Sequence, residues 1–221
     1  MLDIPPQPEL PAALTGRDDQ GGEDLQPYAL LDVIGSLAGV NGASISVMCN
    51  SQARAQALRP GLPAGIEVLV PEPVNLITGG ALVWALQSQL NRDFSRVVAI
   101  AGDALAVPTR VVATALGSLA EADLVLGQTF QSGIYLVGIR NLSGITLLLD
   151  SGAAPNWERL DPRILRDRCR QTEAVFRQVE SKMRLSEFST PEMVKQALRD
   201  AAALAPRMTA ALAGESFTLP V

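Results

Sequence analysis

Asp103 is the first candidate functional residue of this chain, because it stands just beyond an apolar run, residues 97–101, and is separated from it only by Gly102. An uninterrupted run of this length is typical of a strand that is covered by helices on both faces. Open α/β sheets bind ligands just beyond the carboxyl ends of their strands. An aspartate there commonly ligates a hard cation, which in turn holds phosphates. The alternative is that Asp103 caps the loop before Pro108, and composition alone favours this capping role.

A second candidate is the segment Thr78-Gly79-Gly80, which precedes an apolar stretch with helical spacing. Thr78 is a suitable N-cap, and two glycines at a helix start would let a phosphate approach the free N–H groups. A tight turn with close packing of helix on sheet explains the same residues. Since a single pair of glycines is a weak signal, the sequence favours the turn.

The amino-acid composition excludes several classes of catalytic and metal site. The chain has no histidine, which excludes histidine-based triads, histidine metal ligands and histidine general bases. Cys49 and Cys169 are too few and too far apart for a zinc site or a disulfide framework. The net charge of −5 and the pI near 4.8 argue against a nucleic-acid partner. Catalysis would therefore depend on carboxylates, arginines, backbone amides or a bound metal.

The elements that must position these residues alternate between helix and strand, which predicts a mostly parallel sheet with right-handed crossovers. The predicted strands are residues 44–49, 66–70, 97–101, 124–126, 134–139 and 182–188, and the predicted helices are 28–37, 52–58, 78–90, 108–119, 161–179 and 190–204. The apolar segment 145–149 is compatible with an edge strand or a helix start. Arg163, Arg166, Arg170 and Arg177 lie near one face of the helix predicted from residue 161, where a solvated charged face is the commoner explanation.

At 221 residues, the length predicts one α/β domain, here bounded at residues 26–213, with a tail at 214–221. Residues 1–25 are rich in proline and glycine and predict a poorly ordered arm, with a short strand near 11–14. No apolar run is long enough to span a bilayer, and no signal peptide is visible. We therefore expect a cytoplasmic protein, whereas the sequence does not indicate its oligomeric state.

Three segments carry a resemblance to a known family. The family reads V-V-L-I-G-x-D-x-P, A-D-V-V-L-G-P and D-G-G-Y-Y-L-I-G-L, where this chain has residues 97–105, 122–127 and 131–139. A fainter match places residues 187–192 against D-V-D-T-P-E-D. The chain thus resembles the bacterial glycosyltransferase-A-like (GT-A-like) family of nucleotide-diphospho-sugar transferases and radical-SAM/selenodomain-associated transferases. The resemblance implies a three-layer α/β/α sandwich.

The resemblance also implies a site at the carboxyl edge of the sheet. Asp103 and Glu187 would ligate Mg²⁺ or Mn²⁺, and the donor or acceptor would border Gln131, Gly133, Tyr135 and the segment Thr78-Gly79-Gly80. The implied ligand is a nucleotide or nucleotide sugar, and the implied reaction is metal-dependent transfer of a glycosyl or nucleotidyl group.

The chain departs from the family pattern at several of these positions. Leu105 stands where the family has proline, and Ile134 where it has tyrosine. Gln131 and Ser132 replace an aspartate and a glycine of the motif at residues 131–139. Glu187 and Ser189 replace two aspartates of the fainter match. The basic, glycine-rich loop after the family's first strand has no counterpart, since Arg17 is the one basic residue there. The alternative function is therefore a non-catalytic relative that has lost the metal cluster and acts as a binding or scaffold protein. The sequence leaves open whether the chain is an enzyme.

Overall fold

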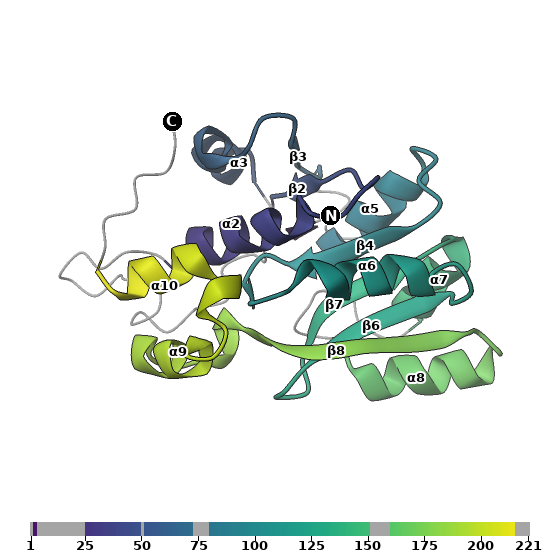
Figure 1. Ribbon diagram of the computed structural model, residues 1–221. Coiled ribbons are helices and arrows are strands. Elements are labelled where there is room, and N and C mark those ends of the chain that lie inside the picture. Colours follow the sequence, from purple (N-terminus) through teal and green to yellow (C-terminus); the bar gives the residue numbers. More distant parts are fainter. Residues whose placement is uncertain (1, 4–24, 50, 73–79, 151–159, 215–221) are drawn as a thin grey trace.

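The computed structural model describes residues 2–3, 25–49, 51–72, 80–150 and 160–214. In this part of the chain an eight-stranded sheet has the order β3-β2-β1-β4-β7-β6-β8-β5 (Figure 1). The strands are β1 (Leu2–Asp3), β2 (Ser46–Met48), β3 (Glu67–Leu69), β4 (Val97–Ala101), β5 (Ala104–Leu105), β6 (Leu124–Thr129), β7 (Ile134–Ile139) and β8 (Phe176–Arg184).

The sheet is mixed but mostly parallel. Strands β3, β2, β1 and β4 are parallel neighbours, and β6 is parallel to β8. Strand β7 runs antiparallel between β4 and β6, where Val97 and Leu124 both pair with Ile139. The short β5 pairs antiparallel with β8. Because six of the eight strands share a direction, their carboxyl ends meet at one edge of the sheet.

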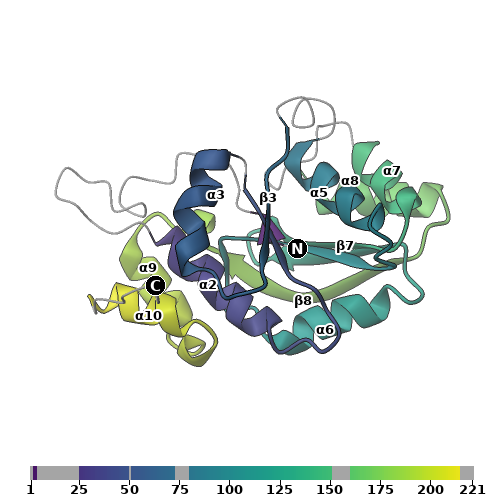
Figure 2. The ribbon, with the colours of Figure 1, turned by 90° about the horizontal axis from the view of Figure 1, so that it is seen from above.

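Helices cover both faces of this sheet. The α-helices are α2 (Gln26–Leu37), α3 (Gln52–Leu58), α5 (Gly80–Leu90), α6 (Thr109–Ser118), α7 (Leu142–Leu149), α8 (Pro162–Gln171), α9 (Pro191–Leu198) and α10 (Pro206–Leu212). Three short 3₁₀ turns are η1 (Arg59–Gly61), η2 (Leu185–Glu187) and η3 (Ala202–Leu204). Helices α2 and α6 lie on one face, and α5, α7 and α8 on the other (Figure 2).

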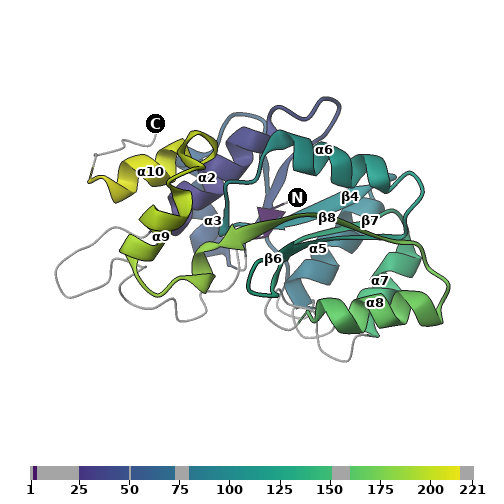
Figure 3. The ribbon, with the colours of Figure 1, turned by 60° about the horizontal axis from the view of Figure 1, so that its bottom comes forward.

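Alternation along the strands fills the two layers of the core. Val98 and Ile100 pack among the side chains of α2 and α6, whereas Val97 and Ala99 pack among those of α5, α7 and α8. A third apolar cluster joins α2, α9 and α10 beside the end of β8 (Figure 3). The predicted three-layer α/β/α sandwich is confirmed.

The structure corrects the elements predicted between residues 161 and 188. The helix predicted to reach residue 179 ends at Gln171, because Glu173 adopts a left-handed conformation (φ 56°) and turns the chain into β8. The last strand accordingly runs from Phe176 to Arg184, and Glu187 lies in a 3₁₀ turn beyond it. The segment 145–149 belongs to helix α7, whose N-cap Asn141 accepts a hydrogen bond from Gly144 N (3.2 Å).

The helix predicted for residues 190–204 is also interrupted. Helix α9 ends at Leu198, and a new helix begins at Pro206 because proline is favoured in the first turn of a helix. The predicted N-caps are confirmed for α8 and α9, where Asp161 and Thr190 accept hydrogen bonds from the N–H groups of Arg163 and Met193.

Leu2 and Asp3 fall within the predicted N-terminal arm. They form β1 in the middle of the sheet, where Leu2 pairs with Val47 on one side and Ile100 on the other. The strand predicted near residues 11–14 lies outside the described residues. None of the helices described here is long and apolar enough to cross a membrane.

Candidate functional site at the carboxyl edge

Backbone pairing after β4 fixes the position of Asp103. All five residues of β4 are buried, and the chain then continues through Gly102 and Asp103 into β5. Strand β5 pairs with β8 so that Ala104 lies opposite Arg184, and Leu185 N donates to Asp103 O (2.8 Å). Strand pairing thus places Asp103 beside Arg184, 81 positions away in the sequence.

Asp103 and Arg184 form a buried ion pair. Their side chains are 1% and 5% exposed, and Arg184 Nε donates to Asp103 Oδ1 at 2.8 Å. The other carboxylate oxygen, Oδ2, accepts a hydrogen bond from Ser186 N at 3.2 Å. Charge-assisted hydrogen bonds of this kind are stronger than neutral ones. Both oxygens of Asp103 are therefore engaged by the chain itself.

The remaining donors of Arg184 are less well satisfied. Nη1 donates to Ile134 O over a long 3.5 Å, and Nη2 has no hydrogen-bond partner within the described residues. The main-chain N–H of Arg184 donates to Glu187 Oε2 (3.2 Å). Arg184 thus lies between the two carboxylates, Asp103 and Glu187, that were predicted to hold a metal.

The turn between β6 and β7 closes the site on one side. Gln131 Nε2 donates to Glu187 O (3.2 Å), and Gly133 N donates to Thr129 Oγ1 (2.8 Å). A Cβ atom at Gly133 would lie 3.2 Å from Glu187 Oε1, so the turn packs directly against η2. Four predicted site residues, Asp103, Gln131, Gly133 and Glu187, are therefore brought together.

Tyr135 is not brought to this surface. Its side chain is fully buried and its hydroxyl donates to Glu180 O (2.6 Å). Burial, with the nearby Glu180 charge, raises the pKa of Tyr135 well above its usual value. The ring lies over Gly127, where a Cβ atom would come within 2.6 Å of it. Tyr135 joins β6, β7 and β8 inside the core, so its position does not support contact with a ligand.

Only part of the predicted glycine segment can be assessed. Gly80 is the first residue of α5 and has a φ of 70°, a conformation that favours glycine. Thr78 and Gly79 lie outside the described residues. The role of this segment in phosphate binding stays a prediction.

A cavity of about 480 Å³ lies between the β6–β7 turn and the start of α8. Gln128 and Ser132 line it on one side, and Arg163 and Arg166 line it on the other. Arg166 also donates to Gln178 (3.2 Å). Two of the four arginines singled out in the sequence thus gather at the carboxyl end of β6, together with Asp161, whose carboxylate accepts a hydrogen bond from Arg163 N. With two arginines and one aspartate, the lining keeps a net positive charge, which favours an anionic ligand.

The arrangement around Asp103 does not fit a hard cation. Mg²⁺ requires several oxygen ligands in nearly octahedral geometry. Here a guanidinium contacts one oxygen of Asp103, a backbone N–H contacts the other, and Glu187 Oε2 is itself hydrogen-bonded. No group of three Asp, Glu or Cys side chains suited to a metal occurs in the described part of the chain. Metal ligation by Asp103 and Glu187 stays a prediction.

Sequence reasoning missed Arg184, although a weak signal was present. Arg184 stands between Met183 and Leu185, three residues before the fainter match at residues 187–192, and an arginine between apolar residues at a strand end suggests a buried charge. Its partner could not be predicted, because the contact depends on the pairing of β5 with β8.

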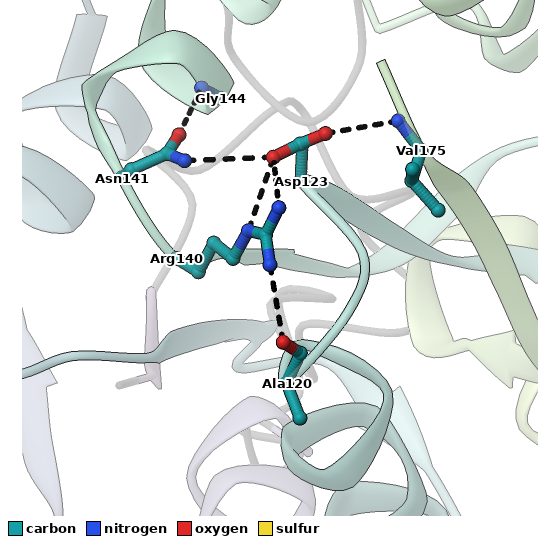
Figure 4. A network of polar contacts seen from close by, with 6 residues as sticks. All are labelled: Ala120, Asp123, Arg140, Asn141, Gly144 and Val175. Atoms are coloured by element: carbon teal, nitrogen blue, oxygen red, sulfur yellow. Dashed lines mark hydrogen bonds and ion pairs between the residues drawn. The ribbon is translucent and has the colours of Figure 1, made fainter.

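A second polar network, missed in the same way, lies at the opposite ends of β6 and β7 (Figure 4). Asp123 Oδ1 accepts from Arg140 Nη2 (2.8 Å) and Nε (3.0 Å), and Oδ2 accepts from Val175 N (2.9 Å). Arg140 Nη1 donates to Ala120 O (3.1 Å). Burial opposes ionisation, but the Val175 N–H and the Arg140 guanidinium outweigh it and lower the pKa of Asp123. This network fixes the strands that carry the site.

Residues 33–151 match the family described as "Uncharacterized protein conserved in bacteria (DUF2064)". The chain belongs to this family. The match includes β4, Asp103 and the β6–β7 turn. No match was found among curated proteins.

Solved structures show what the fold resembles. A Desulfovibrio desulfuricans G20 protein, provisionally named a nucleotide-diphospho-sugar transferase, is 16% identical over 98% of this chain and 97% of its own, with a TM-score of 0.70. A cytidylyltransferase from Leptospira borgpetersenii is 12% identical over 92% and 94%, with a TM-score of 0.52. A CMP:2-keto-3-deoxy-manno-octonic acid synthetase complexed with CTP is 11% identical over 91% and 98%, with a TM-score of 0.52.

These likenesses confirm the fold expected from the resemblance. The chain has a GT-A-like, nucleotide-sugar-transferase-like architecture. At identities this low, the solved structures establish the fold and leave the activity of this chain open.

Proposed function

We propose that this chain is a nucleotide-binding, non-catalytic relative of the nucleotide-diphospho-sugar transferases and requires no divalent cation at Asp103. The observation that carries the proposal is the buried ion pair between Asp103 and Arg184. The Arg184 guanidinium lies against the Asp103 carboxylate, which would otherwise hold a metal. Arg184 therefore supplies the positive charge that balances Asp103.

The Arg184 guanidinium and a divalent metal ion would compete for the carboxylate of Asp103. A divalent ion at Asp103 would need the carboxylate oxygen that Arg184 Nε now occupies. Displacing Arg184 would leave a guanidinium that is almost wholly buried without its counter-charge. Loss of one partner from a buried pair costs about 3–5 kcal/mol, which metal binding would have to offset.

The nucleotide part of the proposal rests on the cavity lined by Gln128, Ser132, Arg163 and Arg166. Arginine binds phosphates through several N–H donors in a fixed geometry. The cavity lies at the edge where open α/β sheets bind their ligands. One neighbour of the same fold is described in complex with CTP, which supports a nucleotide as the ligand.

A second candidate is an active transferase, and one observation favours it. Arg184 Nη2 has no acceptor among the described residues and Nη1 makes only a long hydrogen bond, so the guanidinium is incompletely satisfied. A donor phosphate that took up Arg184 would free Asp103 for a cation. In that case nucleotide and metal would bind together.

A thermal-shift panel separates the two candidates. The nucleoside diphosphates and triphosphates of cytidine, uridine, guanosine and adenosine, with UDP-glucose, are tested in EDTA and in Mn²⁺. Ligand at a hundredfold its Kd stabilises a protein by about 2.7 kcal/mol, which is readily measured. We expect a shift of the same size in EDTA and in Mn²⁺, reduced by Arg163→Gln and Arg166→Gln.

Arg170→Gln is the matched control, since Arg170 lies on α8 but outside the cavity and pairs with Asp167. It should leave the nucleotide shift unchanged. A shift that needs both nucleotide and Mn²⁺ would support the transferase instead. No shift with any nucleotide would refute nucleotide binding.

A further inference from the structure

A separate cavity of about 310 Å³ opens at the other edge of the sheet, where β2 and β4 begin. Its walls are the loop after α2, the residues around the start of β4 and the inner side of α6. Val97 borders this cavity at the start of β4, whereas Asp103 lies beyond the end of that strand. The cavity is therefore distinct from the site at the carboxyl edge. Its volume is at the lower end of the range for small-molecule sites.

One buried amide in the cavity wall lacks a partner. Gln89, near the end of α5, is 5% exposed and lines the cavity. Its Nε2 has no hydrogen-bond partner in the part of the chain that the structure describes. A buried donor left unpaired is unfavourable, so such groups usually have a partner in the functional state. Nε2 itself has almost no accessible surface, so a turn of the Gln89 side chain would bring this donor to an acceptor oxygen of a ligand in the cavity.

The rest of the lining defines the charge and shape of that ligand. Val40, Ile45 and Leu116 offer an apolar surface, and no acidic residue lines the cavity. Arg96 is the one charged lining residue, and its Nη1 donates to Leu116 O (3.0 Å), which fixes the side chain over α6. A single cation without a carboxylate in the lining favours a ligand with one negative charge.

Phe94 lies at the mouth of the cavity and is 38% exposed. The turn before it is held by Asp93, which has a φ of 65°, and by the hydrogen bond from Phe94 N to Gln89 O (3.4 Å). The aromatic ring and the buried amide are thus linked through one short turn. An apolar ligand body could extend from Gln89 towards this ring.

From this geometry we propose that the cavity binds a small organic monocarboxylate with an apolar body. The carboxylate oxygen accepts the hydrogen bond from Gln89 Nε2, Arg96 balances the charge, and the aliphatic or aromatic body packs on Val40, Ile45 and Leu116. This site does not depend on the proposed nucleotide function, since the two sites share no lining residue.

Ligand-observed NMR and calorimetry with phenylacetate and 3-methylbutanoate test this site. Phenethylamine, which has a similar apolar body but the opposite charge, is the control ligand. We expect both carboxylates to bind the wild type and phenethylamine not to bind. Gln89→Met keeps the length of the side chain and removes the donor, and it should weaken phenylacetate binding at least tenfold.

Gln87→Met, an exposed change on the same helix, is the matched control and should bind like the wild type. Circular dichroism establishes that both variants are folded. The proposal is refuted if neither carboxylate binds, if Gln89→Met binds phenylacetate as tightly as the wild type, or if phenethylamine binds equally well. In Gln89→Met, the nucleotide thermal shift should be unchanged, so failure of one proposal is distinguishable from failure of the other.

Discussion

Asp103→Asn should destabilise the protein strongly, even without any ligand. The substitution keeps the shape of the side chain but removes its charge, and Arg184 then remains buried without a counter-ion. The side chains of both residues are at most 5% exposed, so water cannot compensate the guanidinium. The carboxylate also accepts the N–H of Ser186, and this charge-assisted bond becomes a neutral one at best.

The magnitude follows from the burial of the pair. Removing one partner of a buried pair costs about 3–5 kcal/mol, whereas exposed ion pairs contribute about 0–1 kcal/mol. Asp167→Asn is the matched control, because Asp167 pairs with Arg170 on the surface at 3.3 Å, with side chains 64% and 75% exposed. The two Asp→Asn changes should therefore differ in cost by at least about 2 kcal/mol.

Urea unfolding followed by circular dichroism measures both variants at pH 7. The midpoint should fall markedly for Asp103→Asn and hardly at all for Asp167→Asn, with unchanged slopes. Adding Arg184→Met to Asp103→Asn removes the unpaired charge and should recover part of the loss. If Asp103→Asn lies within about 0.5 kcal/mol of the wild type, the pair does not have the structural role described here.

Three further changes test the strands around the site. The pKa of Asp123 in the folded protein lies below its ordinary value of 3.8. The ionised carboxylate therefore stabilises the folded state above about pH 3.8, and this contribution is lost as the pH falls through the folded pKa. The difference in melting temperature between wild type and Asp123→Asn should accordingly narrow from pH 6 to pH 3. Gly127→Ala should cost about 3 kcal/mol in urea unfolding, because its Cβ would meet the Tyr135 ring at 2.6 Å. Tyr135→Phe should cost about 1 kcal/mol by the same measurement, as the bond to Glu180 O is lost; an unchanged midpoint in either variant would contradict this packing.

Much of the fold was predictable because its central strands are short, continuous apolar runs. Residues 97–101 and 134–139 are buried at every position, as such runs require in a sheet covered on both faces. Two features could not be predicted. Strand β1 has only two residues, which are too few for a periodic signal. The turn around Glu173 could not be predicted, because arginines occur both before and after it and suggested one continuous helix face.

The site was predictable in part for a related reason. Asp103, Gln131, Gly133 and Glu187 come together because motifs at strand ends meet at one edge of the sheet. The ion pair with Arg184 depends on the register of β5 against β8, which no local pattern encodes.

Titration with Mn²⁺, followed by the electron paramagnetic resonance signal of the free ion, shows whether Arg184 occupies the position of a cation at Asp103. With CDP present, and CDP alone as the reference, the wild type and Glu187→Gln should bind no more Mn²⁺ than the nucleotide itself does. Additional Mn²⁺ binding by the wild type that Glu187→Gln abolishes would show that the two carboxylates hold a metal, and would contradict the account.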